Sequence, residues 1–342
     1  MDLPIVDLDA FLRDPTSGAA RAECEKAARA LVTYGALVLH DARVAEDDNA
    51  TFLDLLEDYF ALPPETLRRD ERPDLGFQVG VTLENTEKPK CAVDEPCLDV
   101  ISRLAPAERP LDISAHSPDP KCRFFWSMAG AEKPPYATRF PALNAENVVP
   151  DDVTVKDRWT PVMQKWGTSM KSAVSGLAEM AAVGLGLPAS TFTDAGRYGP
   201  HLLAPTASDL VKYGKNDTIL AGFHTDLNFF TIHGRSRYPG LRAVLHHFAV
   251  HEVVVNQQTL DTIEKRKQAF PDRPLVRISS TLFWHLSSDF DLAPIPALLD
   301  QAKALRAEQF NLGRDEGEEV VYEPMKVGEQ VQNELKHIAL MA

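Results

Sequence analysis

Apolar side chains recur at helical spacing in one long stretch of the chain, from about residue 155 to residue 185. Steps of three and four residues line up one face of an α-helix. Here they join Trp159, Val162, Met163, Trp166, Met170, Val174, Leu177 and Ala181. Gly184, Gly186 and Pro188 end the pattern. A stripe of this kind is typical of a helix packed against a core, so we expect it to be the scaffold of the fold.

The pattern changes after Pro200, where short apolar runs alternate with turn signals. Such runs predict β-strands. They cover residues 208–213, 218–223, 227–233, a segment after Gly240, 252–255 and 276–284, and a helix over 259–269 interrupts them. Many short strands separated by turns are typical of an antiparallel barrel or jelly roll. We therefore expect an α+β fold with a double-stranded β-helix, or jelly roll, at its core.

The rest of the chain mixes helices and strands. The N-terminal part predicts a strand over 3–8, a helix over 19–34 ended by Gly35, a buried strand over 36–39 and a helix over 49–60. Residues 72–150 are irregular except for a strand at 124–126. We divide the chain into an N-terminal α/β region (1–150), a scaffold helix with linker (151–200), a jelly-roll catalytic core (201–290) and C-terminal helices (291–342), the last over 298–307 and 328–340.

Composition narrows the class of protein. The 342 residues are 44% hydrophobic and 25% charged, as in a globular protein. A formal net charge of −14 argues against a nucleic-acid partner. Neither a bilayer-spanning apolar run nor a secretory signal is present. Cys24, Cys91, Cys97 and Cys122 show no CxxC pairing, so we expect reduced thiols and a cytoplasmic protein. The oligomeric state has no signal in the sequence.

One short motif carries metal chemistry. His224 and Asp226 stand two residues apart in a predicted strand, and strand side chains alternate, so both point to one face. Together with a His from a neighbouring strand they would make the two-His, one-carboxylate set that leaves half of an Fe(II) coordination sphere open. With 10 His in the chain the motif alone is weak. Arg277 and Ser279, later in the chain, also stand two residues apart and so share a strand face.

These motifs and their order resemble the iron(II)/2-oxoglutarate-dependent dioxygenases of the isopenicillin N synthase-like family. The opening Leu3-Pro4-Ile5-Val6-Asp7-Leu8, the segment Tyr34-Gly35-Ala36-Leu37-Val38-Leu39-His40 and the long helix before the strands also resemble that family. The resemblance implies that His224, Asp226 and His251 bind Fe(II). It also implies that Arg277 and Ser279 anchor the far carboxylate of 2-oxoglutarate. Tyr213 is a weaker candidate for a hydrogen bond to the same carboxylate.

The resemblance further implies an activity. The family oxidises small organic substrates with O2, in reactions of the hydroxylation type, and releases succinate and CO2. Fe(II) is then the cofactor and 2-oxoglutarate the co-substrate, and a small molecule rather than a nucleic acid or a membrane is the partner. Its identity has no signal in the sequence. The alternative is a catalytically impaired or non-catalytic relative with a degraded metal site.

The chain departs from the family at one place. His251 follows Asp226 by 25 residues, and the family's interval is about twice as long. We therefore expect an incomplete jelly roll that lacks roughly two strands. Residues 243–255 contain no Gly or Pro, so either one long strand or a helix fits them. A shifted register would let His246 or His247 replace His251 as the third ligand. His201, His233 and His285 are expected to be structural, with His285 a remote spare ligand.

Overall fold

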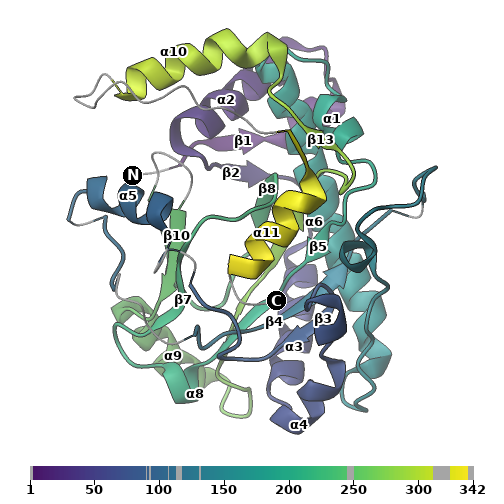
Figure 1. Ribbon diagram of the computed structural model, residues 1–342. Coiled ribbons are helices and arrows are strands. Elements are labelled where there is room, and N and C mark those ends of the chain that lie inside the picture. The colour runs from purple at the N-terminus through teal and green to yellow at the C-terminus, as the bar shows by residue number, and fades with distance from the viewer. Residues whose placement is uncertain are drawn as a thin grey trace.

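The computed structural model describes residues 3–89, 91, 94–106, 108–112, 118–130, 132–244, 250–310 and 324–337 (Figure 1). The helices are α1 (Leu8–Arg13), α2 (Gly18–Tyr34), α3 (Glu46–Phe60), α4 (Pro64–Leu67), α5 (Glu95–Arg103), α6 (Lys156–Gly184), α7 (Thr191–Ala195), α8 (Leu210–Tyr213), α9 (Gln257–Ala269), α10 (Leu299–Phe310) and α11 (Val327–His337). None of these described helices has the length and apolar character that crossing a bilayer requires.

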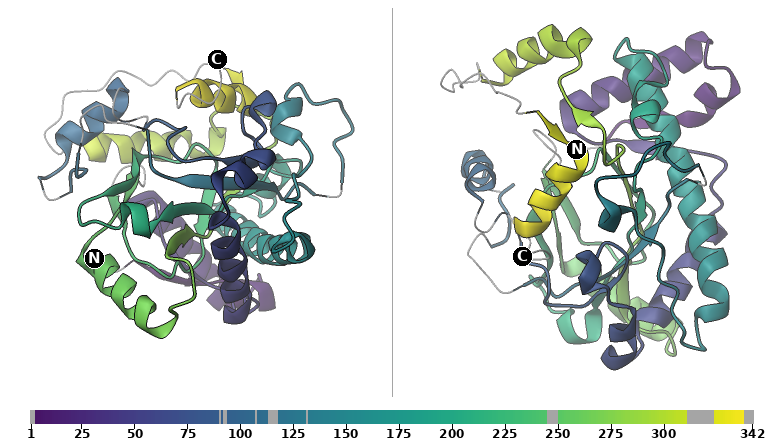
Figure 2. Two further views of the ribbon diagram at one scale, coloured as in Figure 1. Left: turned by 90° about the horizontal axis from the view of Figure 1, so that it is seen from below. Right: turned by 45° about the vertical axis from the view of Figure 1, so that its right-hand side comes forward.

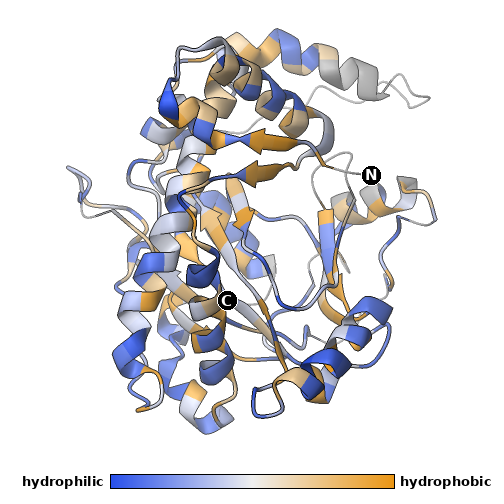
Figure 3. Cartoon of the chain, turned by 180° about the vertical axis from the view of Figure 1, so that it is seen from behind, coloured by the Kyte–Doolittle hydropathy of each residue, from blue (hydrophilic) through white to orange (hydrophobic). Residues whose placement is uncertain are grey.

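The strands are short, as expected for a jelly roll. They are β1 (Ile5–Asp7), β2 (Val38–His40), β3 (Gly80–Thr82), β4 (Cys122–Ser127), β5 (Leu202–Leu203), β6 (Thr206–Asp209), β7 (Ile219–His224), β8 (Phe230–His233), β9 (Leu241–Val244), β10 (Val250–Val254), β11 (Val276–Ser279), β12 (Thr281–Trp284), β13 (Asp291–Leu292) and β14 (Met325–Lys326). Figure 3 shows apolar residues gathered on the inner strands and polar residues on the outward helix faces.

The long helix α6 is the scaffold that its apolar stripe predicts. It buries Trp159, Met163, Trp166 and Met170 in the main core, and its far half packs on α2. Glycine allows the close approach: a Cβ at Gly184 would lie 2.1 Å from the carbonyl oxygen of Cys24. The right-hand view in Figure 2 shows α6 and α11 on opposite sides of the sheets.

Two sheets face each other and form the jelly-roll core. One has the order β7-β10-β9, and the other has the order β11-β6-β4-β5-β12-β8 with β3 added beside β4. A jelly roll has eight strands in two sheets, which is four strands in each sheet when they are divided evenly. The small sheet here has three. In the described part of the chain, β8 and β9 are edge strands. The jelly-roll prediction is confirmed, whereas the loss of about two strands stays a prediction, because the described sheets have three and seven strands.

The predicted strand over 276–284 is two strands. β11 pairs with β6, whereas β12 pairs with β5 and β8. Ser280 lies between them, and its Oγ accepts a 2.7 Å hydrogen bond from Trp166 Nε1 on α6. The chain therefore bends at a buried residue that α6 fixes, and one run of residues serves two parts of the large sheet.

Three local predictions need correction. Residues 241–255 are not one long strand, because β9 and β10 pair antiparallel with Val244 opposite Val250. His246 and His247 lie outside the described residues. The strand expected over 208–213 ends at Asp209, whose carboxylate accepts from Val211 N and Lys212 N and so starts α8. The strand after Gly35 is not buried, because β2 pairs with β1 alone and lies near the surface.

The cysteines also correct a prediction. Cys91 and Cys97 form a disulfide, while Cys24 and Cys122 are free. The spacing of six residues has no CxxC signature, but Asp94 caps α5 through Cys97 N and turns the chain back toward Cys91. The expectation of four reduced thiols was wrong, so the cysteines no longer support a cytoplasmic location.

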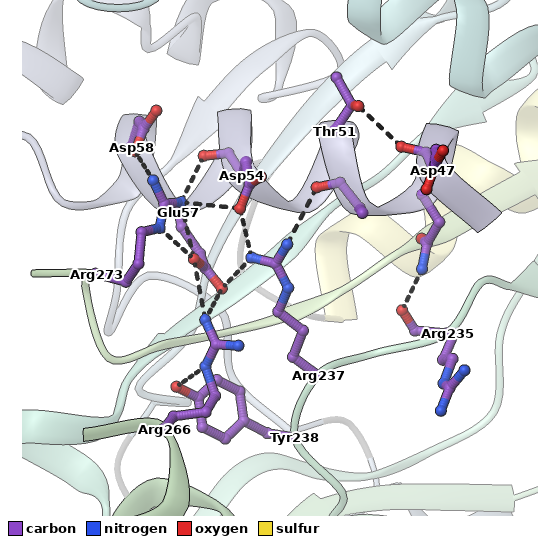
Figure 4. A network of polar contacts seen from close by, with 12 residues as sticks. Asp47, Thr51, Asp54, Glu57, Asp58, Arg235, Arg237, Tyr238, Arg266 and Arg273 are labelled. Atoms are coloured by element: carbon purple, nitrogen blue, oxygen red, sulfur yellow. Dashed lines mark hydrogen bonds and ion pairs between the residues drawn. The ribbon is translucent and has the colours of Figure 1, made fainter. Parts of the chain in front are cut away.

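A buried carboxylate ties α3 to the jelly roll. Glu57 is 1% exposed and receives Arg237 at 2.8 Å, Arg266 at 3.3 Å and Arg273 at 2.9 Å. Figure 4 shows the three guanidinium groups converging on it from different segments. Arg237 precedes β9, Arg266 lies on α9 and Arg273 precedes β11. One side chain on α3 thus holds three parts of the core that are distant in sequence.

We predict that Glu57→Gln lowers the free energy of unfolding by about 3 kcal/mol, because the amide leaves three half-buried guanidinium groups without their shared charge partner. Urea denaturation followed by circular dichroism measures it.

Glu46→Gln is the matched control. Glu46 also lies on α3 and pairs with Arg235, but both side chains are about 80% exposed. We therefore expect the free energy of unfolding to change by no more than about 0.5 kcal/mol. Equal losses in the two variants would contradict a special role for Glu57.

Candidate metal centre and its cavity

A cavity of about 180 Å³ lies between the two sheets. The small sheet contributes β7 and β10, the large sheet contributes strands including β4, β5 and β12, and α11 contributes Val331 and Leu335. In Figure 1 α11, in yellow, crosses in front of the space between β7 and β4. The predicted residues His224, Asp226, His251 and Ser279 all line this cavity.

Strand pairing brings the three predicted metal ligands together. His251 on β10 is the direct cross-strand partner of His224 on β7, and their ring centroids lie 4.3 Å apart. β7 ends at His224, so Asp226 is just beyond the strand. Its Oδ1 lies 3.8 Å from His224 Nε2 and 4.0 Å from His251 Nε2. One ligand atom from each residue falls within 4.8 Å of the others, close enough to share one ion.

Hydrogen bonds aim two of these ligand atoms. His224 Nδ1 lies 2.6 Å from the carbonyl oxygen of Gly222, which leaves Nε2 as the nitrogen that faces Asp226. Thr231 Oγ1 donates to Asp226 Oδ2 at 2.6 Å and leaves Oδ1 for an ion. Thr231 lies on β8 of the large sheet, so this contact also links the two sheets beside the site. Partners of this kind orient metal ligands and tune their basicity.

The local electrostatics keep the ligands in their binding forms. Burial, the neighbouring His251 and the charge of Lys121 lower the pKa of His224 to about 4. Burial alone would raise the pKa of Asp226, but His251, His224 and the Thr231 hydrogen bond hold it below its ordinary value. A neutral imidazole and an ionised carboxylate at neutral pH are the states that bind a metal.

Arg277 and Ser279 meet as the strand parity predicts. Arg277 is 4% exposed, and its Nη1 donates to Ser279 Oγ at 2.6 Å. Its Nε donates to the carbonyl oxygen of Pro239. Burial lowers the pKa of Arg277 to about 10, and among the described residues it has no carboxylate partner. A buried guanidinium without an acid is a candidate anion site, because buried charges in proteins are normally paired.

Tyr213 is placed differently from the prediction. It ends α8 rather than lying on a strand, and it packs beside Leu210 and Leu220 with Lys212 Nζ 4.8 Å from its ring centroid. It is not among the residues that line the cavity. The structure thus brings five of the six predicted residues to or beside one cavity, with Tyr213 apart.

Sequence reasoning missed several cavity residues. His233 and His285 line the cavity. A buried group of four charged residues, Glu87, Asp119, Lys121 and Arg123, lines it as well. Lys121, Arg123 and Phe125 alternate along β4, and the same alternation relates Thr281, Phe283 and His285. This period of two was the available signal, but it does not say which face meets the metal site.

Solved structures share this arrangement of helices and sheets. A full-length Neurospora crassa protein, crystallised in complex with alpha-KG, has 16% identity and a TM-score of 0.64, with coverage of 98% of this chain and 96% of that one. A 2OG-Fe(II) oxygenase family protein from Caulobacter crescentus has 17% identity and a TM-score of 0.64, covering 98% and 99%. The chain has the fold of the 2OG-Fe(II) oxygenases. The rice dioxygenase for auxin oxidation has 14% identity and a TM-score of 0.54, covering all of both chains.

The sequence itself gives no such match. No protein-family model matches it, and no curated protein sequence matches it significantly. The shared fold is therefore visible in the packing of the sheets and not in overall sequence similarity.

A second buried histidine sits behind the cavity wall. His201 is 2% exposed, stacks on Trp284 at 5.1 Å and accepts the backbone N–H of His285 through Nδ1 at 3.1 Å. Burial, together with the charge of Lys171, puts the pKa of His201 well below its ordinary value. His201 therefore stays neutral in the folded protein.

We predict that Thr231→Val weakens Mn(II) binding about 10-fold to 100-fold, because Asp226 loses the hydrogen bond that orients it. Isothermal titration measures it. Thr262→Val is the control, since Thr262 is half-buried on α9 and its hydroxyl donates to Gln258 O. Unchanged affinity in Thr231→Val would contradict the orienting role.

We also predict a pH effect from His201. Below its ordinary pKa near 6.5 the unfolded chain binds a proton that the folded chain excludes, so the free energy of unfolding falls as pH falls. The loss is up to about 1.4 kcal/mol per pH unit for such a group. Chemical denaturation of His201→Gln between pH 7 and pH 5 should show a shallower decline than the wild type. Identical slopes would contradict burial of a neutral His201.

Proposed function

We propose that the protein is an Fe(II)- and 2-oxoglutarate-dependent oxygenase that oxidises a small organic substrate with O2 and releases succinate and CO2. One observation carries this proposal. Two imidazole nitrogens and one carboxylate oxygen converge in a cavity whose wall also holds Ser279. Ser279 is the hydrogen-bond partner of buried Arg277, which has no carboxylate partner in the described part of the chain.

The donor set fits iron. Two His and one carboxylate on one side of an ion, with open positions opposite, are the ligand set of non-haem Fe(II) oxygenases. Here Nε2 of His224, Oδ1 of Asp226 and Nε2 of His251 are the atoms that would hold it. The remaining polar atoms of His224 and Asp226 are occupied by Gly222 and Thr231, which suits a site organised for one ion.

Arg277 and Ser279 fit the far carboxylate of 2-oxoglutarate. A guanidinium and a hydroxyl in contact offer several donors to one carboxylate, and charge-assisted bonds of this kind are strong when buried. Tyr213 lies away from the cavity lining, so Arg277 and Ser279 carry this assignment, and a role for Tyr213 remains a prediction.

When bound, Fe(II) and 2-oxoglutarate supply the oxidising chemistry with O2. The protein supplies position and shielding. Thr231 holds the Asp226 carboxylate, Gly222 holds the His224 ring, and burial keeps His224 neutral. The two sheets enclose the reacting groups, which limits side reactions with water.

Structural neighbours support a small organic substrate. The Neurospora crassa protein has been crystallised with alpha-KG and thymine or 5-formyluracil, and JOX2 with 2OG, Fe and JA. We extend from them to this chain only the class of small molecule. The absence of a nucleic-acid partner and a cytoplasmic location remain predictions from the sequence.

A non-catalytic relative is the second candidate. The specific observation in its favour is the three-stranded sheet β7-β10-β9, with β9 at an edge in the described part of the chain. Conversion of 2-oxoglutarate to succinate by the Fe(II)-loaded protein, with or without a substrate, separates the two candidates.

We predict that Arg277→Gln weakens 2-oxoglutarate binding about 100-fold while Mn(II) binding stays within about twofold, because the lost charge-assisted bonds touch the diacid and not the ion. Titration of the Mn(II)-loaded protein with 2-oxoglutarate measures it.

Arg235→Gln is the matched control, since Arg235 is 80% exposed and pairs with Glu46 outside the cavity. It should bind 2-oxoglutarate as the wild type does. If Arg277→Gln binds 2-oxoglutarate normally, the assignment of the diacid site is wrong.

A further inference from the structure

Two buried nitrogen atoms in the cavity wall have no part in holding iron or 2-oxoglutarate as proposed above. Among the described residues, Arg123 Nη2 and His285 Nε2 are buried side-chain atoms without a hydrogen-bond partner. Both residues line the cavity that contains the metal centre. Leaving a buried donor or acceptor unpaired is costly, so a pair of them on one wall points to a ligand that completes them.

Register places Arg123 on the floor of the large sheet beside the 2-oxoglutarate residues. Thr206 on β6 is the cross-strand partner of both Arg123 on β4 and Ser279 on β11. All three residues line the cavity. Arg123 therefore lies two strands away from Ser279 on the same face of the large sheet, so it is a second cavity guanidinium, distinct from Arg277.

An apolar surface lies next to Arg123. Its guanidinium carbon lies 3.9 Å from the ring centroid of Phe125, and Phe125 meets Phe283 edge-on at 6.0 Å. His285 follows Phe283 by two residues and so shares its side of the chain. The wall thus presents aromatic rings with one polar atom toward each end.

The charges around Arg123 cancel within the cluster. Arg123 Nε lies 2.7 Å from Glu87 Oε1, while Lys121 Nζ lies 3.1 Å from Glu87 and 2.9 Å from Asp119. Two cations and two anions leave no net charge, and all four side chains are at most 15% exposed. A carboxylate beside Arg123 would leave one negative charge uncompensated in a buried place, which is unfavourable. A neutral acceptor would satisfy Nη2 without that cost.

We propose that Arg123, His285, Phe125 and Phe283 form the substrate-binding wall of this site, and that the substrate is an uncharged, flat molecule with a carbonyl oxygen. The oxygen accepts from Arg123 Nη2, the flat body packs face-on against one phenyl ring and edge-on against the other, and His285 Nε2 meets a second polar atom. This inference rests on the proposed oxygenase function and adds the chemical class of its substrate.

Benzamide is a suitable probe, because it is flat, uncharged and carries one carbonyl. Its binding to the metal-free full-length protein is measured by NMR titration, so the result does not depend on iron or 2-oxoglutarate. We expect millimolar binding, weakened about tenfold or more in Arg123→Met, which loses the donor to the carbonyl oxygen. Arg235→Met, at an exposed position, should bind as the wild type does.

Benzoate tests the charge argument. It is compared with benzamide in Arg277→Gln protein, so that it has neither iron nor that guanidinium to bind. We expect benzamide to bind more tightly than benzoate. Adding Glu87→Gln gives the cluster a net positive charge and should improve benzoate binding about tenfold relative to benzamide.

Several results would overturn the proposal. They are equal benzamide affinity in Arg123→Met and Arg235→Met, no benzamide binding at millimolar concentration, and tighter binding of benzoate before Glu87 is changed. If Arg123→Met does not fold, Arg123→Lys keeps the charge but lacks the fork and should also weaken benzamide. In the wild type, nuclear Overhauser effects should join benzamide to the Phe125 and Phe283 rings, and their absence contradicts the wall.

A failed oxygenase function gives a different result. If iron and 2-oxoglutarate bind normally but benzamide binding does not depend on Arg123, only the proposal of the substrate-binding wall is rejected. Benzamide binding that depends on Arg123, with no binding of iron, would leave a small-molecule pocket without the proposed oxidation.

Discussion

The antiparallel pairing of β7 with β10 is the constraint on which the proposed metal centre depends. It sets His251 directly opposite His224, so two imidazoles from distant parts of the chain face one carboxylate. A shift of one residue in this register would turn His251 to the other face of the sheet, because strand side chains alternate. β10 is the middle strand of its sheet, paired on both sides, which makes such a shift costly.

The second sheet completes the centre. Thr231 on β8 holds Asp226, and Arg277 and Ser279 on β11 hold the opposite side of the cavity. α6 fixes the bend between β11 and β12 through the hydrogen bond from Trp166 to Ser280. α3 is tied to the segments before β9 and β11 and to α9 through the ion pairs of Glu57. Helices and buried polar contacts beside the sheets therefore help to hold the strands around the cavity. This explains how a jelly roll with a three-stranded face still brings the ligands together.

Much of this could be predicted from local pattern. The stripe from Trp159 to Ala181 gave α6, and alternation with turn signals gave the jelly roll. The short motifs suggested His224 with Asp226 and Arg277 with Ser279, because the members of each pair are only two residues apart in the sequence. His251 needed the resemblance, because its pairing with β7 is long-range. Asp226 illustrates a limit: β7 ends before it, and Thr231, not strand parity alone, sets its position.

What failed depended on tertiary packing. Asp209 capped a helix where alternation predicted strand, β9 and β10 formed two antiparallel strands where one strand was expected, and Cys91 paired with Cys97. Lys121 and Arg123 lie in a region that was predicted to be irregular, whereas the structure places β4 inside the large sheet. Such residues are recognised only when burial shows that their charges must be compensated.

The most direct test is an anaerobic Fe(II) soak of crystals of the full chain, with anomalous diffraction at the iron edge. We expect one peak about 2 Å from His224 Nε2, Asp226 Oδ1 and His251 Nε2. An iron peak away from His251, or none near these three atoms, would contradict the proposed centre.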